Sequence, residues 1–312
     1  ENDSVMLFKL QDAPDTFGVV TDYKGIAIGK SAQLITLEFP YFKEGNSYAL
    51  DEYSFDELKG YEKIYLSGFT YTNREKAEAL VNKLSEAGVK VYIDMNSIPY
   101  DNLTNRQKFL GVTSQVIAFE ESFGKLTFND QDIYADIFFS QDKPWNTVYL
   151  DNLDNVNGYG IVDSKKLAFY GTKNNKNQIY IGFNLLYHFI QTDDSIVEDM
   201  LCNIFELDED ELPAREIVPL SVITVGDSIT IQSEYDNVDT TIAFQDNFIS
   251  KEDFSEDNNL LMVNKGTTYM NFEYPYMKKG VMVSIFGIIG TMSLFGMLIF
   301  IKREEKLYEK SN

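Results

Sequence analysis

The sequence has 312 residues, a formal net charge of −22 and 44% hydrophobic residues. A chain of this length and apolar content has room for two domains, each with its own core. Its acidity argues against nucleic acid as a partner, because phosphate groups are bound by Lys and Arg side chains. One cysteine and one histidine exclude an internal disulfide and a structural zinc site, and we expect no metal and no cofactor.

The stretch GIAIGKSAQ, residues 25–33, contains the Gly29-Lys30-Ser31 ending of a phosphate-binding loop. That pattern needs four residues between its glycines, and only three separate Gly25 from Gly29. The three are Ile, Ala and Ile, which suit a strand better than a loop whose N–H groups curl around phosphate. We therefore predict a strand followed by a helix with Ser31 as N-cap, and no nucleotide site.

Residues 25–205 alternate short apolar runs with helical patterns. The clearest unit has a strand from Lys63 to Ser67, a helix in TNREKAEALVNKLSEAG and a strand in VKVYIDM. This succession predicts parallel pairing with a helical crossover. Further strands are expected in QVIAF and TVYLD, and a hairpin in KLAFYGTKNNKNQIYIGFN with its turn at KNNKN. We therefore predict an α/β domain over residues 25–205, with a flavodoxin-like parallel sheet.

The remaining extramembrane part follows an acidic run, ELDEDELPAR, at residues 206–215. The run ends near a proline and is typical of a linker. Residues 216–277 alternate apolar and polar side chains, with turn signals at short spacing. This pattern predicts a small antiparallel β-sandwich domain.

The segment 280–301 has 22 residues and no charge. At about 1.5 Å per residue it reaches about 33 Å, enough to cross the hydrocarbon core of a membrane. Basic residues follow it, so the positive-inside rule places residues 302–312 in the cytoplasm and residues 1–277 outside it. Tyr274 and Tyr276 precede the segment, at the level expected for the membrane–water interface.

Small residues within this segment recur at steps of four, three and four, at Gly280, Ser284, Gly287 and Thr291. The spacing puts them on one helix face, which would allow a second transmembrane helix to approach closely. The alternative is that Gly and Ser are simply common in such helices. The chain begins ENDSVMLFKL, with neither an initiator Met nor a signal sequence. We expect residues 1–24 to continue from a missing upstream region that contains further transmembrane helices.

Carboxylates near strand ends are the candidate catalytic groups. Asp94 ends the strand in VYIDM, at the edge where an open sheet binds ligands, and Asp56 lies before another strand. A pair of these could act as acid and base, but chance proximity is favoured among 49 carboxylates. DNLDNVNGYG, residues 151–160, lacks the spacing of a calcium loop, so we predict an Asx-rich loop with an Asn-Gly turn.

Two stretches carry family resemblances. The series GIAIGKSAQLI, YEKIYLSGF, AEALVNKLSEAGVKVYIDM and NQIYIGFNLLYHFIQTDDSIVEDML resembles the class I glutamine-amidotransferase-like α/β domains of bacterial surface and membrane proteins. NKGTTYMNFEYPYMKKGVMVS is similar to the C-terminal end of polytopic membrane proteins, either 6-pyruvoyl-tetrahydropterin-synthase-related or polytopic-glycosyltransferase-like. In those proteins a β-domain ends in a Tyr-Pro motif and a glycine before the last helix, which Tyr274, Pro275 and Gly280 match.

An active amidotransferase needs a nucleophilic Cys on a strand-to-helix elbow, with a His and a carboxylate. Cys202 lies instead in the helical stretch SIVEDMLCNIF, and His188 lies among apolar residues in NLLYHFI. We therefore predict a degenerate domain without catalysis.

The resemblance implies a binding or scaffolding module of a polytopic bacterial membrane protein that synthesises, exports or modifies cell-surface polysaccharide or glycolipid. Its expected partners are the membrane, the missing helices of the same chain, and a glycan or a cell-envelope protein. One alternative is an extracytoplasmic hydrolase or transferase that uses carboxylates. Another is a single-pass surface sensor or assembly subunit.

Overall fold

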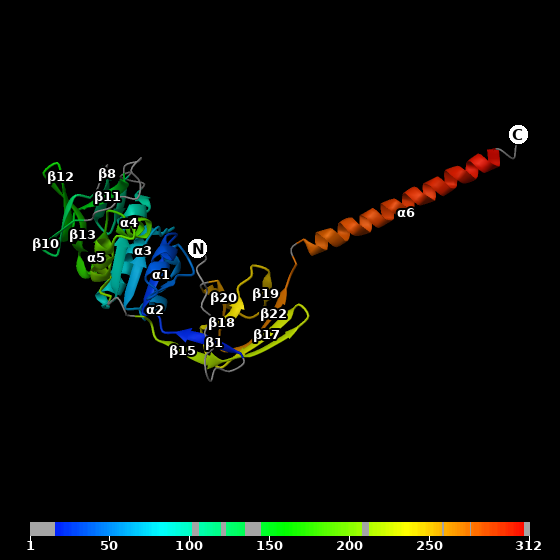
Figure 1. Ribbon diagram of the computed structural model, residues 1–312, viewed down its shortest axis with the longest axis horizontal. Helices are drawn as coiled ribbons and strands as arrows, with labels where there is room; N and C mark the ends of the chain where they lie inside the picture. The colour runs from blue at the N-terminus through cyan, green and yellow to red at the C-terminus, as the bar shows by residue number, and fades with distance from the viewer. Residues whose placement is uncertain are drawn as a thin grey trace. The chain divides into compact units, whose positions relative to one another are not determined.

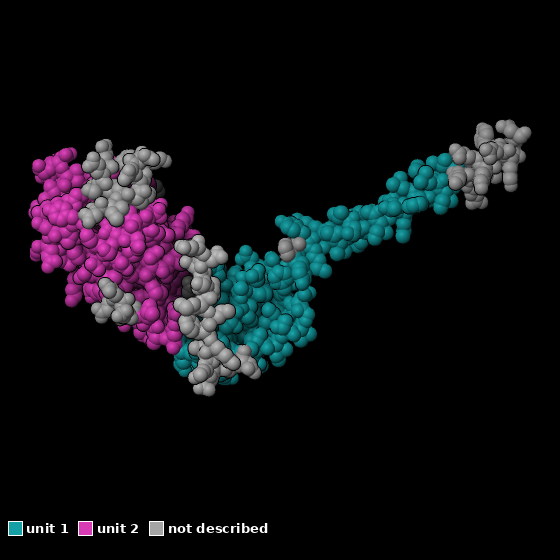
Figure 2. All heavy atoms as spheres, in the orientation of Figure 1, with its two compact units in different colours: residues 1–20, 216–312 teal, residues 21–215 magenta. Residues whose placement is uncertain are grey.

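A computed structural model describes residues 16–101, 106–119, 123–134, 145–207, 212–257, 259–274 and 276–308. The chain divides into two compact units. Unit 2 covers Thr21–Arg215, and unit 1 combines Glu1–Val20 with Glu216–Asn312 (Figure 2). Strand β1 (Phe17–Thr21) therefore joins the sheet of a unit whose other strands lie almost 200 residues later.

Unit 2 is built on one mixed sheet, to which thirteen strands of the described residues belong (Figure 1). Its parallel part has the order β3-β2-β4-β5-β14. The bounds are β2 Gly25–Ile28, β3 Phe42–Glu44, β4 Lys63–Leu66, β5 Lys90–Asp94 and β14 Asn175–Ile181. The helices are α1 Ala32–Glu38, α2 Phe55–Leu58, α3 Arg74–Glu86, α4 Leu185–Thr192 and α5 Ser195–Phe205, with short 3₁₀ turns at Leu50–Glu52 and Met95–Ser97.

Beyond β14 the sheet is antiparallel, with β14 paired to β13, β13 to β11 and β11 to β8. Two further strands continue the order to β7 and β6, and β12, β9 and β10 pair beside β13. The bounds are β6 Tyr100–Asp101, β7 Arg106–Phe109, β8 Val112–Phe119, β9 Lys125–Phe128, β10 Gln131–Tyr134, β11 Trp145–Asp151, β12 Asn155–Val162 and β13 Lys165–Lys173.

Two cores cover the faces of this sheet, because alternate strand residues point to opposite sides. Ala27, Tyr65 and Tyr92 pack with α1, α4 and α5. The residues next to them in β2, β4 and β5 pack with α2 and α3. Burial on both faces explains why the short parallel strands are nearly continuous apolar runs.

The prediction of a flavodoxin-like α/β fold is wrong. Strands make up 42% of the structure and helices 28%, and most of the strands pair antiparallel. The βαβ unit of β4, α3 and β5 is confirmed, but its extension to the whole domain fails. Between Ser97 and Leu185 the described residues contain strands and no helix. Without a helical crossover, successive strands return as hairpins and pair antiparallel.

Unit 1 contains two small sheets and one long helix. The orders are β15-β1-β18-β21-β20 and β16-β17-β22-β19, and both sheets contribute to one core that includes Val218, Ile231 and Met270. The bounds are β15 Arg215–Pro219, β16 Ser221–Val225, β17 Ser228–Ser233, β18 Val238–Ala243, β19 Phe248–Ser250, β20 Phe254–Asp257, β21 Leu260–Val263 and β22 Gly266–Phe272. Helix α6 (Met277–Tyr308) begins shortly after β22. Its segment Lys279–Ile301 is long and apolar enough to span a membrane, and none of it is buried.

Candidate functional site

Asp94 lies at the carboxyl end of β5, where the sequence placed a catalytic candidate. It is buried, and its Oδ2 accepts hydrogen bonds from the Tyr65 hydroxyl at 3.2 Å and from Ser67 Oγ at 2.9 Å. Its Oδ1 accepts from the backbone N–H and the side-chain amide of Asn96, at 3.0 and 2.6 Å. Both oxygens thus hold β4 and the turn after β5 together, so the carboxylate acts as a structural acceptor.

Asp56 lies on the first turn of α2, in a different environment from Asp94. Its side chain is 80% exposed and forms an ion pair with Lys59 at 2.6 Å. This contact lowers the pKa of Asp56, chiefly through the hydrogen bond from Lys59. One candidate carboxylate is therefore hydrogen-bonded inside the fold, and the other is solvated and paired with Lys59. The acid–base pair remains a prediction without geometric support.

Asp51, which lies shortly before Asp56 in the sequence, stabilises the start of α3. It is buried, and its carboxylate accepts from the Thr72 hydroxyl at 2.6 Å and from the Asn73 N–H at 2.8 Å. Burial acts to raise the pKa of Asp51, but these hydrogen bonds outweigh it and lower the pKa. Asn73 is the N-cap, with its side chain accepting from the N–H of Lys76.

In the loop after β2, two backbone amides of GIAIGKSAQ are hydrogen-bonded within the fold. The Lys30 N–H donates to Gly68 O and the Ser31 N–H to Ser67 O, both at 3.2 Å. The amides that would hold a phosphate are therefore used by the loop after β4. Ser31 occupies the N-cap position of α1, as predicted, although its side chain makes no capping hydrogen bond.

His188 is fully buried in α4, beside the rings of Phe123 and Trp145. Its Nε2 lies 3.5 Å from Oδ2 of Asp194, which also caps α5 through the N–H of Ile196. Burial lowers the pKa of His188, and Asp194 opposes this shift only in part. The His188 ring packs in the core, and Cys202 is a half-buried residue of α5. Among the residues that the structure describes, no group of His, Cys, Asp and Glu could hold a metal ion.

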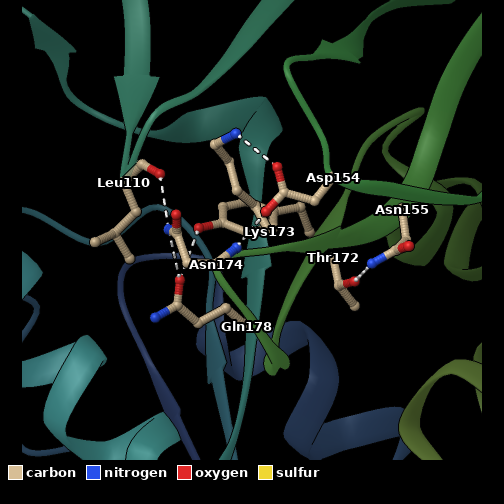
Figure 3. Close-up of polar contacts among 8 residues, drawn as sticks. Leu110, Asp154, Asn155, Thr172, Lys173, Asn174 and Gln178 are labelled. Atoms are coloured by element: carbon tan, nitrogen blue, oxygen red, sulfur yellow. Dashed lines mark hydrogen bonds and ion pairs between the residues drawn. The ribbon is translucent and has the colours of Figure 1, made fainter.

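A polar network at the β13–β14 turn was missed by sequence analysis (Figure 3). Asp154 accepts from Lys173 Nζ at 3.1 Å and from the Asn174 N–H at 2.8 Å. The Asn174 side-chain amide donates to the Gln178 side chain at 3.2 Å and to Leu110 O at 3.3 Å. Asn174 adopts φ +60°, which the tight turn requires and which Asn tolerates well. The network fixes the hairpin against the β7–β8 turn.

The predicted Asn-Gly turn within residues 151–160 is wrong, because strand β12 covers most of this stretch. Asn157 and Gly158 lie inside β12, where the pairing with β13 shifts register. A Cβ at Gly158 would come within 2.8 Å of the Phe169 ring, so the glycine lets two strands pack closely.

The small residues predicted to share one helix face lie on α6. The hydroxyls of Ser284 and Thr291 donate to the carbonyls of Gly280 and Gly287, at 2.9 and 2.7 Å. These back-bonds satisfy the hydroxyls within the helix, and packing against a second helix stays a prediction.

Both interface tyrosines of the sequence analysis precede this helix. The Tyr274 hydroxyl donates to Asp227 at 2.9 Å. Tyr276 is 77% exposed, with Lys279 Nζ 5.6 Å from its ring centre. Pro275 of the predicted Tyr-Pro motif lies outside the described residues.

On one face of the four-stranded sheet in unit 1, the outward side chains of the four strands are uncharged. The carboxylate of Glu252, which follows β19, borders them and accepts from the Tyr269 N–H at 3.1 Å. Cross-strand register arranges its outward side chains in three rows. These ten residues, called here the uncharged face, are Ser221, Gln232 and Thr267, then Ile223, Thr230 and Tyr269, then Val225, Ser228, Asn271 and Ile249. Residues 1–277 as a whole contain 46 acidic and 21 basic residues, and none of them is among these ten.

The uncharged face exposes apolar and polar groups together. Val225, Tyr269 and Ile223 are 70%, 58% and 57% exposed, whereas the opposite side of the same strands packs into the core. Two cross-strand hydrogen bonds order its polar groups. Ser228 Oγ donates to the Asn271 side-chain oxygen at 2.6 Å, and the Gln232 amide donates to Thr267 Oγ1 at 3.5 Å. Sequence analysis missed this face because its members come from four strands.

Comparison with known proteins gives a family without an assigned activity. A family model described as a domain of unknown function, DUF8560, matches residues 24–188. No curated protein matches the sequence. Among solved structures, alpha-L-fucosidase isoenzyme 2 from Paenibacillus thiaminolyticus is similar over 82% of this chain, with 9% identity and a TM-score of 0.38. This chain spans 49% of that protein, and the activity in its name is that protein's own.

Proposed function

The chain belongs to the DUF8560 family, and we propose that it is a membrane-anchored binding module whose extracytoplasmic part binds its ligand through the uncharged face. The observation that carries the proposal is the uncharged face itself, an exposed mixture of apolar and hydrogen-bonding groups on a strongly acidic chain. Exposed apolar groups gathered on one face are typical of interaction sites.

The membrane anchor rests on α6. Its segment Lys279–Ile301 has a mean hydropathy of 2.2, and 23 residues are enough to cross a bilayer. Four basic residues follow it, namely Lys302, Arg303, Lys306 and Lys310. Such a flank favours a cytoplasmic C-terminus, which supports an extracytoplasmic position for residues 1–277.

Binding is favoured over catalysis by the state of the candidate catalytic groups. Asp94 has both oxygens bonded within the fold, and Asp56 is an exposed ion-pair partner. His188 is enclosed by aromatic rings, where burial favours its neutral form. A general acid or base must reach a substrate atom within hydrogen-bond distance, and these side chains are directed elsewhere.

Hydrogen–deuterium exchange of the backbone amides distinguishes a binding module from a carboxylate-dependent enzyme. The full chain in lipid nanodiscs would be compared with and without a cell-envelope fraction of the source organism. We expect slower exchange in β16, β17 and β22, because a ligand on the uncharged face restrains those strands. The variant Thr230→Asp, which puts a charge in the middle of the face, should lose this protection.

Two results would contradict the proposal. Protection centred on β4 and β5 around Asp94 would favour a carboxylate-dependent enzyme. No protection in any strand would leave the uncharged face without a ligand in the envelope.

A further inference from the structure

We infer that the ligand of the uncharged face is a neutral polysaccharide, an inference that rests on the proposed function. The face offers three kinds of group to a ligand: one aromatic ring, three aliphatic side chains, and a set of hydroxyl and amide groups. A sugar chain presents the complementary chemistry, with apolar C–H faces and hydroxyl groups that both donate and accept hydrogen bonds.

Charge selects among sugar chains. The rest of the chain is strongly acidic, so an anionic polysaccharide is repelled as it approaches. On the face itself no Lys or Arg is present to compensate a carboxylate, sulfate or phosphate. Burying an uncompensated charge is costly, whereas an uncharged chain avoids this cost. The ligand is therefore expected to be neutral.

The polar groups of the face are arranged for a ligand with mixed donors and acceptors. Ser228 donates to the Asn271 side-chain oxygen, which leaves the Asn271 amide N–H groups as donors. Gln232 donates to Thr267, which leaves the Gln232 carbonyl oxygen as an acceptor. These pairs lie in the two outer rows, and Tyr269 lies in the row between them. An aromatic ring flanked by ordered donors and acceptors suits a hexose unit.

The size of the face favours a sugar chain over a second copy of the protein. Four strands about 4.8 Å apart and three rows about 7 Å apart cover an area on the order of 300 Å². A stable protein–protein interface buries about 800 Å² on each partner. A second copy would have to extend the contact beyond the uncharged face, and two chains with a net charge of −22 each repel one another, whereas a few sugar units fit within the uncharged area.

Binding of defined polysaccharides tests this inference. The full chain in nanodiscs would be measured by interferometry against immobilised dextran, mannan, galactan and β-glucan, with polygalacturonate and dextran sulfate as anionic probes. We expect at least one neutral polysaccharide to bind and both anionic probes to fail. Tyr269→Ala should weaken binding at least tenfold, and Thr230→Asp should abolish it. Tyr235→Ala, at an exposed tyrosine between β17 and β18 that is not one of the ten residues of the face, should bind as wild type does.

The outcomes separate this inference from the proposed function. Failure of all four neutral polysaccharides, a preference for the anionic probes, or equal binding by Tyr269→Ala and Tyr235→Ala would overturn the inference. If the envelope fraction still protects β16, β17 and β22 from exchange in that case, the proposed binding function holds and the ligand is not a neutral polysaccharide. A Thr230-dependent dimer in light scattering, without polysaccharide binding, would identify a second copy as that ligand. An unchanged melting temperature of each variant shows that the fold is intact.

Discussion

At the scale of single residues, the buried polar groups of unit 2 hold neighbouring elements together. Asp94 joins two strand ends, Asp51 joins a 3₁₀ turn to α3, and Asp194 caps α5 beside His188. A buried carboxylate is stable only when its oxygens are hydrogen-bonded, so each of these acids depends on its partners and fixes them in return.

Replacing Asp94 by Asn should destabilise the protein without any involvement of catalysis. The new amide would place N–H groups against the hydroxyls of Tyr65 and Ser67, or against the N–H of Asn96. We expect a loss of about 3 kcal/mol in the free energy of unfolding, because buried donors lose their acceptor. Asp56→Ala is the matched control, and its exposed ion pair should cost less than about 1 kcal/mol. Chemical denaturation monitored by tryptophan fluorescence measures both, and equal losses would contradict this role of Asp94.

His188 should make stability depend on pH. Its pKa in the folded state is lowered, so the unfolded chain takes up a proton first when the pH falls below about 6.5. The contribution of the neutral ring is present above that pH and is lost as the pH falls towards the folded-state pKa. Asp51, with its lowered carboxyl pKa, acts in a separate window below about pH 4.

The measurement is the thermal midpoint of the wild type and of His188→Gln between pH 7.5 and 5. We expect the wild type to lose stability more steeply over this range than the variant does. Parallel curves would show that protonation of His188 does not affect folding.

At the scale of elements, close contact between two loops fixes the carboxyl edge of the parallel strands. Gly29 has φ +121°, and a Cβ there would lie 2.1 Å from Ser67 O. Gly68, in the facing loop, has φ +66°. The Lys30 and Ser31 amides can donate across this contact only because both positions lack side chains.

Gly29→Ala should therefore cost about 3 kcal/mol, from the unfavourable φ and the displaced carbonyl together. Gly60→Ala is the control, since a Cβ there meets nothing within 4 Å and its φ is not positive. Urea denaturation measures the free energy of unfolding of both variants and of the wild type. A Gly29→Ala protein as stable as Gly60→Ala would mean that the loops are not held this closely.

Local patterns were sufficient to predict some elements and insufficient for others. Helix α3 and its two flanking strands follow from the 3.6-residue pattern and from short apolar runs. The β13–β14 hairpin follows from its Asn-rich turn. The direction of β8, β11 and β12 depends on partners distant in sequence, and so the antiparallel part of the sheet was not predicted.

The uncharged face depends even more on strand pairing, which local sequence patterns do not predict. Ser221 and Asn271 belong to one face only because of the register of β16, β17 and β22. Each strand alone contributes an ordinary mixture of Ser, Thr, Ile and Val. The sequence instead singled out Asp94 and Asp56 by residue type. Asp94 proves to be a buried part of the fold, and Asp56 is an exposed ion-pair partner.

At the scale of the whole molecule, one apolar helix and one uncharged sheet face belong to unit 1, while the family match lies in unit 2. In the proposed function, α6 restricts the protein to the membrane and the uncharged face binds there. Tethering raises the effective concentration of ligand close to the membrane, so that a small binding area is sufficient for occupancy.

Cysteine labelling in intact cells tests the central claim most directly. Thr230→Cys on the uncharged face and Ser164→Cys at the exposed β12–β13 turn would each be made in a Cys202→Ala background and treated with a membrane-impermeant maleimide. We expect Cys at position 164 to react in intact cells, and Cys at position 230 to react fully only after the protein is solubilised and washed. If position 164 fails to react in intact cells, residues 1–277 lie inside the cytoplasm. If position 230 reacts equally before and after solubilisation, the face is unoccupied, and either result contradicts the account.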